Sequence, residues 1–208
     1  VHLALRDTFP LAHLEAHPDK DGNAWDLGGQ DTARWVEALG AAFQVIESAL
    51  PEWNSGVRPH ACARVVPVGW DDAQHRSASF REAPGLAYLS LHPNPLTMAE
   101  AVVHEGQHSA LNLLSHFDAL LDDGPDVLVT SPVRPDPRPL RGVLFAVHAF
   151  VPVAALHLRL AAADHPLAHA SGFAQRRQQV LHSNHDGLTT LEGAHPTAWG
   201  TRILRELR

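Results

Sequence analysis

The amino-acid sequence predicts an α+β fold that is dominated by helices and contains one small antiparallel sheet. Two observations predict it. Stretches in which apolar residues recur every three or four positions fill both ends of the chain, as amphipathic helices require. Between residues 61 and 91 the pattern changes to short runs of β-forming residues. With 208 residues, 45% of them hydrophobic, the chain is long enough to bury a sizeable core.

We expect this core to form one domain over residues 1–208, with three parts. Residues 1–59 form an N-terminal helical part, residues 60–95 the small sheet, and residues 96–208 a second helical part. Because the chain begins at Val1 and not at a methionine, a signal segment or an upstream domain can have preceded it.

The first predicted helix spans residues 31–50. Asp31 is a typical N-cap and Pro51 a typical stop. Its apolar positions follow the helical period: Trp35, Val36, Leu39, Phe43, Ile46 and Leu50. The pattern therefore predicts an amphipathic helix.

Three short runs predict the strands of the sheet, at residues 63–68, 76–80 and 86–91. Gly69 and the pair Pro84-Gly85 separate them, and both are typical of turns. Short runs joined by such turns favour a small antiparallel sheet.

A long helix is predicted over residues 97–121. Apolar residues recur along it at helical intervals, and Thr97 and Glu100 have the spacing of a capping box. The turn residues 122–125 would end it.

The last part of the chain begins with a proline-rich loop, residues 122–137. Pro139 then opens a second long apolar helix that ends near residue 164. Residues 173–191 and 197–207 predict two further helices.

Charge and composition exclude several classes of partner. The net charge is -7 and the arginines form no basic stripe, so a nucleic-acid partner is not expected. Cys62 is the only cysteine, which rules out an intrachain disulfide. No apolar run approaches the roughly 20 residues of a membrane span. We therefore expect a cytoplasmic protein with no membrane partner.

An HExxH motif, His104-Glu105-Gly106-Gln107-His108, lies in the helix predicted over residues 97–121. Positions four apart share one face of a helix, so the imidazoles of His104 and His108 can converge on one divalent metal. Glu105 points about a quarter-turn away, within reach of a metal-bound water. The motif predicts a metal site with Glu105 as its candidate catalytic residue.

A third metal ligand must come from elsewhere in the chain. Leu111 and Leu114 stand where a metzincin has glycine and histidine, which excludes that class. A carboxylate ligand on a following helix is also missing, because no glutamate lies between Glu105 and Glu192.

His148 is the best remaining ligand candidate. It lies in an apolar helix, where an imidazole without a polar partner would be costly to bury. Pro152, four residues later, removes the N–H that would bond the His148 carbonyl and favours a bend there. The alternative is a core histidine bonded to a backbone carbonyl.

Other histidines are weaker ligand candidates. His116 lies about two helical turns beyond His108, roughly 12 Å away and too far for the same metal. The remaining pairs with ligand-like spacing are His165 with His169 and His182 with His185. We expect these pairs to cap helices or to lie in solvent.

Three segments together resemble the HExxH-motif peptide-modification family, whose members act in the biosynthesis of ribosomally made, post-translationally modified peptides. They are residues 82–86 (EAPGL), 99–112 (AEAVVHEGQHSALN) and 131–150 (SPVRPDPRPLRGVLFAVHAF). The resemblance covers roughly residues 60 to 160. It implies an iron(II)- and 2-oxoglutarate-dependent peptide β-hydroxylase, with a zincin-like helix used for oxygen chemistry.

Such an enzyme needs three protein ligands and three open metal positions, two for 2-oxoglutarate and one for dioxygen. His104, His108 and His148 meet the ligand count. The distal carboxylate of 2-oxoglutarate also needs a cation, for which arginine is best suited. Arg138 is the first candidate because it precedes a predicted helix N-terminus. Arg134 is the second, and Arg141 completes the cluster.

The sequence therefore leaves two enzymatic functions as hypotheses. In the first, iron(II) and 2-oxoglutarate support hydroxylation of a side-chain Cβ in a precursor peptide, and Glu105 tunes the surroundings of the metal or orders the substrate. In the second, the same histidines hold zinc and Glu105 is the general base of a metallopeptidase. His60, His75 or Tyr88 would then donate to the oxyanion. A catalytically inactive binding module with the same fold is a third interpretation.

Overall fold

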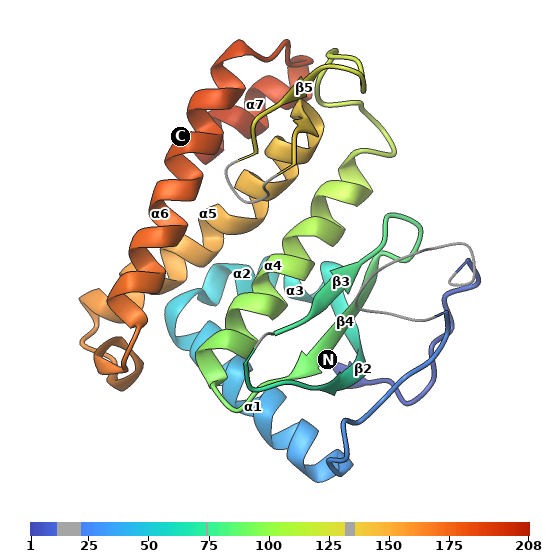
Figure 1. Ribbon diagram of the computed structural model, residues 1–208, viewed down its shortest axis with the longest axis vertical. Coiled ribbons are helices and arrows are strands. Elements are labelled where there is room, and N and C mark those ends of the chain that lie inside the picture. The colour runs from blue at the N-terminus through green and yellow to red at the C-terminus, as the bar shows by residue number, and fades with distance from the viewer. Residues whose placement is uncertain (12–21, 74, 132–135) are drawn as a thin grey trace. The chain divides into compact units, whose positions relative to one another are not determined.

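The structure is a computed structural model that describes residues 1–11, 22–73, 75–131 and 136–208. The chain divides into two compact units, Val1–Asn112 and Leu113–Arg208, and each is described by itself. Whether they form the single predicted domain stays a prediction. The α+β class with a small sheet is confirmed (Figure 1).

The first unit holds β1 (His2–Leu3), α1 (Thr32–Ala49), α2 (Pro51–Gly56), α3 (Arg58–Ala61), β2 (Cys62–Trp70), β3 (Ser77–Ser79), β4 (Gly85–Leu91) and most of α4 (Pro95–Leu114). The second unit holds β5 (Leu128–Val129), β6 (Arg138–Pro139), α5 (Leu140–Ala162), α6 (Phe173–Thr190) and α7 (Ala198–Leu207).

Helix α1 confirms the helix predicted over residues 31–50. The Asp31 side chain accepts a hydrogen bond from the Arg34 N–H at 2.8 Å, so it is the predicted N-cap. Trp35 and Ile46 are completely buried, whereas Val36 is 61% exposed and lies off the buried face. Pro51 ends α1 and also begins α2, where a proline is tolerated because no N–H is needed.

The sheet has the order β1-β2-β4-β3, and its strand directions correct the sequence-based expectation. Only β3 and β4 are antiparallel; β1 pairs with β2, and β2 with β4, in parallel. The prediction of an antiparallel sheet was therefore wrong. Parallel pairing needs a long crossover connection, and the segment between Trp70 and Gly85, which includes β3, supplies it.

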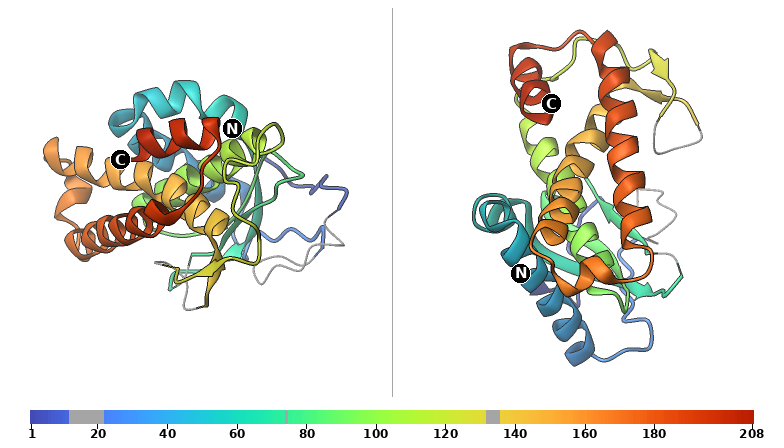
Figure 2. Two further views of the ribbon diagram at one scale, coloured as in Figure 1. Left: turned by 90° about the horizontal axis from the view of Figure 1, so that it is seen from above. Right: turned by 90° about the vertical axis from the view of Figure 1, so that its left-hand side faces the viewer.

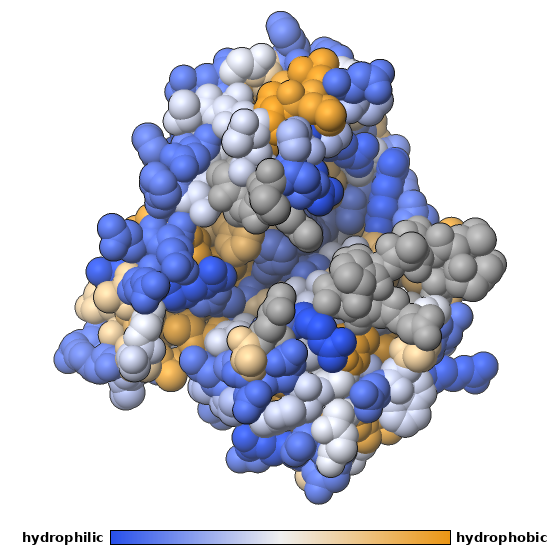
Figure 3. Space-filling model, viewed as in Figure 1, coloured by the Kyte–Doolittle hydropathy of each residue, from blue (hydrophilic) through white to orange (hydrophobic). Residues whose placement is uncertain are grey.

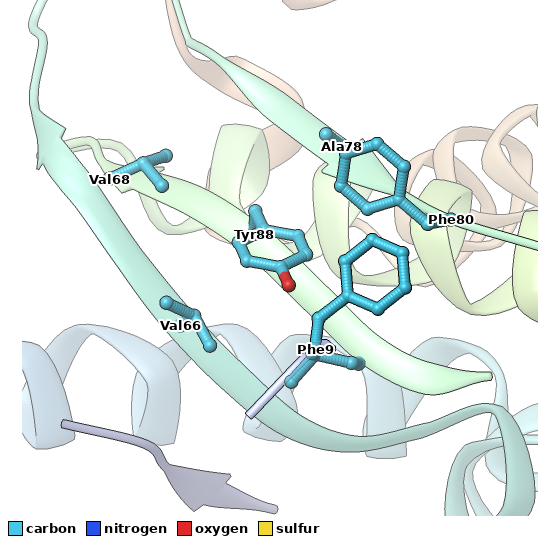
Figure 4. Packing of buried hydrophobic residues seen from close by; sticks show 7 residues of the cluster. Phe9, Val66, Val68, Ala78, Phe80 and Tyr88 are labelled. Atoms are coloured by element: carbon cyan, nitrogen blue, oxygen red, sulfur yellow. The ribbon is translucent and has the colours of Figure 1, made fainter. Parts of the chain in front are cut away.

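Side chains alternate between the two faces of this sheet. One face carries a cluster of seven buried residues (Figure 4): Phe9, Val66, Val68, Ala78, Phe80, Leu86 and Tyr88. Tyr88 donates its hydroxyl to Asp7 Oδ1 at 2.9 Å, which fastens the N-terminal segment to this face. Because Ala78 points into the cluster, the neighbouring Ser77 and Ser79 point to the opposite face.

Helix α4 begins and ends earlier than the predicted residues 97–121. The side chain that caps the start of the helix belongs to Asn94 and not to Thr97. Its Oδ1 accepts a hydrogen bond from the Leu96 N–H at 2.9 Å. The chain leaves the helix after Leu114, and Asp118 then accepts the Thr197 hydroxyl at 2.6 Å. The capping-box prediction was wrong because a better cap lies three residues upstream.

Helices α5, α6 and α7 confirm the three helices predicted for the last part of the chain within a few residues. Figures 1 and 2 show α5 and α6 side by side. Thr197 caps α7 by accepting from the Gly200 N–H at 3.0 Å.

Helix α5 corrects the expectation that no apolar run approaches a membrane span. Its 23 residues are long and apolar enough to cross a membrane by length and composition. The window that passes this test is 56% buried, as in the core helix of a folded domain.

The segment predicted as a loop, residues 122–137, contains a short strand. Strand β5 pairs with β6 in antiparallel fashion, with Leu128 opposite Pro139. Val127 and Leu128 are about half exposed, and Figure 3 shows hydrophobic side chains gathered over this hairpin.

Candidate functional site

The two histidines of the HExxH motif lie close together on α4. The ring centroids of His104 and His108 are 4.3 Å apart, and their planes are nearly perpendicular at 83°. Both rings are partly buried, and the His104 side chain is 20% exposed. The structure therefore brings together two of the three predicted ligands, on the face of α4 where the four-residue spacing predicts them.

Glu105 is almost completely buried, with 3% of its side chain exposed. The hydroxyl of Ser77 donates to its Oε1 at 2.7 Å, and the hydroxyl of Ser79 donates to its Oε2 at 2.5 Å. Oε1 also lies 4.0 Å from Nε2 of His104. Both oxygens of the candidate catalytic carboxylate thus accept hydroxyls from β3. We call Ser77, Glu105 and Ser79 the serine clamp.

The serine clamp follows from the geometry of one strand and one helix. Residues two apart on a strand share a face, so Ser77 and Ser79 present both hydroxyls toward α4. Antiparallel pairing with β4 sets Ser77 opposite Leu89 and Ser79 opposite Ala87. The clamp joins residues 26 and 28 positions apart in sequence, and no helical pattern predicts it.

The next turn of α4 packs against α2. Trp53 donates its Nε1–H to Gln107 Oε1 at 3.3 Å. A Cβ placed on Gly106 would lie 2.6 Å from Cζ2 of Trp53, so only glycine lets the indole approach this closely. Contacts on two sides therefore fix the motif turn, one to β3 and one to α2.

Cys62, at the start of β2, is completely buried near this turn. Burial and, to a smaller extent, the negative charge of Glu105 raise the pKa of its thiol to about 12. A thiol with so high a pKa stays protonated at neutral pH and is a poor nucleophile or metal ligand.

The three candidate oxyanion donors of the peptidase hypothesis lie in different surroundings. Tyr88 points to the Phe9 face, away from the serine clamp, and bonds Asp7. Burial, together with the nearby His92, lowers the pKa of His75 to about 4, so its imidazole is neutral at pH 7. His60 is exposed on α3. The position of Tyr88 removes it from the candidates.

The predicted third ligand, His148, lies in the middle of α5 in the second unit and is partly buried. Pro152 lies inside the same helix, as predicted. Asn184 of α6 donates its Nδ2 to the Phe150 carbonyl at 3.0 Å, which ties this stretch of α5 to its neighbour. Because His148 belongs to the other unit, the three-histidine ligand set stays a prediction.

The candidate 2-oxoglutarate arginines also belong to the second unit. Arg138 lies on β6 directly before α5, as predicted, and its Nε is 2.8 Å from Oδ2 of Asp136. Arg141 donates to the Ser115 hydroxyl at 3.0 Å and lies over the Phe145 ring. Arg134 lies outside the described residues.

The weaker histidine candidates have structural contacts. The side chain of His165 accepts from the Leu167 N–H and caps a short 3-10 helix, Pro166–His169. His169 pairs with Asp164, and His182 pairs with Asp186. These contacts confirm the expectation that the two histidine pairs cap helices or lie at the surface.

The geometry supplies part of a metal site. Among the described residues, no group of three or more histidine, cysteine, aspartate or glutamate side chains could hold a metal ion. Within the first unit, His104 and His108 fit two ligand positions, and Glu105 adds a buried carboxylate whose oxygens both accept hydroxyls.

Ser77 and Ser79 were not among the site residues predicted from the sequence. A signal was present, because the alternation Ser77-Ala78-Ser79 in a predicted strand puts two hydroxyls on one face. This alternation does not identify Glu105 as the partner of the two serines, since the strand and the helix meet only in the folded chain.

Comparison with known proteins adds no relative: no protein-family model matches the chain, and no curated protein has significant similarity to it.

Proposed function

We propose that this protein is an iron(II)- and 2-oxoglutarate-dependent oxygenase that hydroxylates a side-chain Cβ of a ribosomally made precursor peptide. One support for this proposal is the resemblance of residues 82–86, 99–112 and 131–150 to the HExxH-motif peptide-modification family. It also includes a cytoplasmic location, a zincin-like role for α4, and no partner among nucleic acids or membranes.

The observation that carries this proposal is the serine clamp. A general base must accept a proton from a water that lies within hydrogen-bond reach. Both oxygens of Glu105 already accept hydrogen bonds from serine hydroxyls, and only 3% of the side chain is exposed to solvent. An anchored, buried carboxylate beside two histidines suits an oxygenase, in which Glu105 need not activate water, better than a peptidase.

Each candidate residue has a role under this proposal. His104, His108 and His148 would hold the metal, and Arg138 would bind the distal carboxylate of 2-oxoglutarate through its guanidinium. The chemistry supplied there would be activation of dioxygen, with one oxygen atom inserted into the Cβ–H bond and the other entering the new carboxylate of succinate as the keto acid loses carbon dioxide. The protein contributes orientation and exclusion of water.

Anaerobic titration with iron(II) and 2-oxoglutarate tests the proposal. The chelate of the two has a weak visible charge-transfer absorption, which we expect to appear on binding. Arg138→Ala should weaken 2-oxoglutarate binding at least tenfold, because a bidentate carboxylate contact is lost. Arg159→Ala, on the exposed face of α5, is the matched control. If the wild-type protein gives no absorption band, the oxygenase proposal is wrong.

Glu105→Gln separates this proposal from the zinc peptidase. Loss of a general base costs about 10²–10⁴-fold in rate. Under our proposal the amide keeps a polar contact with the serines, and hydroxylation should fall by less than about tenfold. Peptide cleavage that requires zinc and is abolished by Glu105→Gln would instead support the peptidase.

A further inference from the structure

The segment that leads into α4 has an unusual set of hydrogen bonds. Residues 93–96 read PNPL, and because a proline has no N–H, only two backbone N–H groups remain in this segment. Nδ1 of His92 accepts the Asn94 N–H at 3.0 Å, and Oδ1 of Asn94 accepts the Leu96 N–H at 2.9 Å. The Asn94 carbonyl then accepts the Met98 N–H at 3.2 Å, in the first turn of α4. A chain of hydrogen bonds therefore leads from the His92 ring into this helix.

The hydrogen bond between Asn94 and His92 exists only while the His92 ring is neutral. A backbone N–H can only donate, so Nδ1 of His92 accepts with its lone pair, and the ring proton lies on Nε2. Protonation of the ring would put an N–H on Nδ1 as well, and two donors would then face each other. Histidine is the side chain that ordinarily gains this proton between about pH 8 and pH 5.

We infer that His92 is an acid-sensitive latch at the start of α4: the neutral ring holds Asn94 in place, and the protonated ring releases it. Asn94 caps the helix through its side chain, so its release leaves the first N–H groups of α4 without that cap. Acid therefore loosens the first turn of the helix that carries the HExxH motif. The latch works without a bound metal and does not depend on the proposed function.

The groups around His92 indicate which histidine responds first to acid. The ring of His75 lies 6.3 Å from the His92 ring, centroid to centroid. Burial, and then the closeness of His92, lower the pKa of His75 to about 4. A hydrogen bond with the Ser90 backbone and the negative charges of Glu100 on α4 and Asp71 after β2 act in the opposite direction. His75 therefore stays neutral at pH 5, and the latch opens through His92 alone.

Buried side chains keep this opening local. Leu96 is only 5% exposed and Met98 is completely buried, so most of α4 stays packed when the latch is released. Local opening of this kind, at a helix end, costs less free energy than unfolding of the whole chain. The expected change is thus a larger population of molecules in which the first turn of α4 is open.

Native-state hydrogen exchange of the full chain tests the latch, with His92→Asn as the matched variant. Asparagine can accept the N–H two residues later, as Asn94 itself does, but it does not titrate. At pH 7.5 we expect equal protection of the Leu96 and Met98 amides in the two proteins. At pH 5.0 the wild-type amides should exchange at least about tenfold faster than those of the variant, as the loss of one hydrogen bond implies.

Three further variants separate the His92 lone pair from other causes. His92→Ala removes the acceptor at every pH, so the Leu96 and Met98 amides should exchange fast at both pH 7.5 and pH 5.0. His75→Gln removes the neighbouring ring but keeps the latch, so it should lose protection at pH 5.0 as the wild type does. His60→Gln, which changes an exposed histidine of α3, should do the same.

Two results would overturn the inference. One is equal protection of the Leu96 and Met98 amides at pH 5.0 in the wild-type protein and in His92→Asn. The other is a loss of protection that disappears in His75→Gln, because the charge of His75 would then be its cause. Neither result bears on the oxygenase proposal, which the titration with iron(II) and 2-oxoglutarate tests separately.

Discussion

The polar contacts of Glu105 in the first unit and of His195 in the second unit differ in how far they are exposed to solvent. In the first unit the key polar groups are buried between the sheet and the helices, as Glu105 and Cys62 are. In the second unit 80% of the His195 side chain is exposed, although that of its partner Asp123 is only 7% exposed. Burial makes a polar contact costly to break, and exposure makes it cheap. We therefore expect substitution of Glu105 to cost more stability than substitution of His195.

A glycine packed against the backbone in the second unit should be an exception, because its substitution should cause the largest loss of stability. A Cβ on Gly200 would lie 1.8 Å from the carbonyl oxygen of Leu120, a backbone atom that cannot move aside. Gly200→Ala should lower the free energy of unfolding by about 3 kcal/mol or more. Chemical denaturation followed by circular dichroism measures this. Gly193→Ala, where no atom lies within 4 Å, is the control and should change stability little.

The partly buried imidazole of His75, in the first unit, should give the next largest effect on stability, and this effect depends on pH. Burial lowers the pKa of His75 to about 4 from its ordinary value of 6.5, so the folded protein binds a proton less readily than the unfolded chain. Stability is then full above pH 6.5 and falls as the pH drops from 6.5 toward 4. The loss is at most about 3 kcal/mol, at 1.36 kcal/mol per pKa unit.

Denaturation curves at pH 7, 5.5 and 4 test this, with His75→Gln expected to flatten the fall in stability. His60→Gln, which changes an exposed histidine of the same unit, should keep the wild-type pH dependence. A wild-type protein equally stable at pH 7 and pH 4.5 would contradict a buried neutral His75.

A smaller effect is expected at the motif turn. Gly106→Ala places a methyl group 2.6 Å from the Trp53 ring, which must shift. Overpacking costs about 1–3 kcal/mol, and alanine regains about 1 kcal/mol of helix propensity, so a net loss of up to about 2 kcal/mol should follow. Gly40→Ala in α1 meets no atom within 4 Å and should stabilise by about 0.5–1 kcal/mol. Thermal unfolding would show both changes.

The smallest effect should come from the surface pair of the second unit. Hydrogen bonding to Asp123 raises the pKa of His195, and the same contact lowers the pKa of Asp123. Because the pKa of His195 is raised in the folded protein, the protonated histidine stabilises the fold below pH 6.5. This stabilisation is lost as the pH rises through the pKa of the folded protein. The lowered aspartate pKa stabilises above pH 3.8 and is lost as the pH falls.

His195→Ala should therefore lower the melting temperature slightly near pH 5.5 and have no effect at pH 9. Added salt should shrink the difference at pH 5.5, because exposed charges are screened. A drop in melting temperature near pH 5.5 as large as that of Gly200→Ala would contradict the surface role of this pair.

How far the sequence predicts this structure differs from element to element. Helix α1 was predicted closely because its cap, Asp31, and its apolar period are local signals. The end of α4 was missed: the apolar period continues to residue 121, but the helix stops at Leu114, and Asp118 instead bonds Thr197, 79 residues away. The strand directions were missed for a related reason, since strand pairing is set by contacts between distant segments.

The candidate site divides in the same way. The four-residue spacing of His104 and His108 was enough to predict that their rings lie together, because a helix fixes that geometry locally. The surroundings of Glu105 were not predictable, since the serines that hold it lie on a strand whose pairing and facing are decided only by the folded sheet.

The sequence by itself thus determined α1 with its Asp31 cap, the existence of the other long helices and the histidine pair, because each depends on residues within a few turns of one another. Only the tertiary structure decided that β2 and β4 are parallel, that α4 stops at Leu114, and that Glu105 is clamped by two serines. The physical reason is that these features come from contacts between distant segments, whose partners no local period or cap specifies.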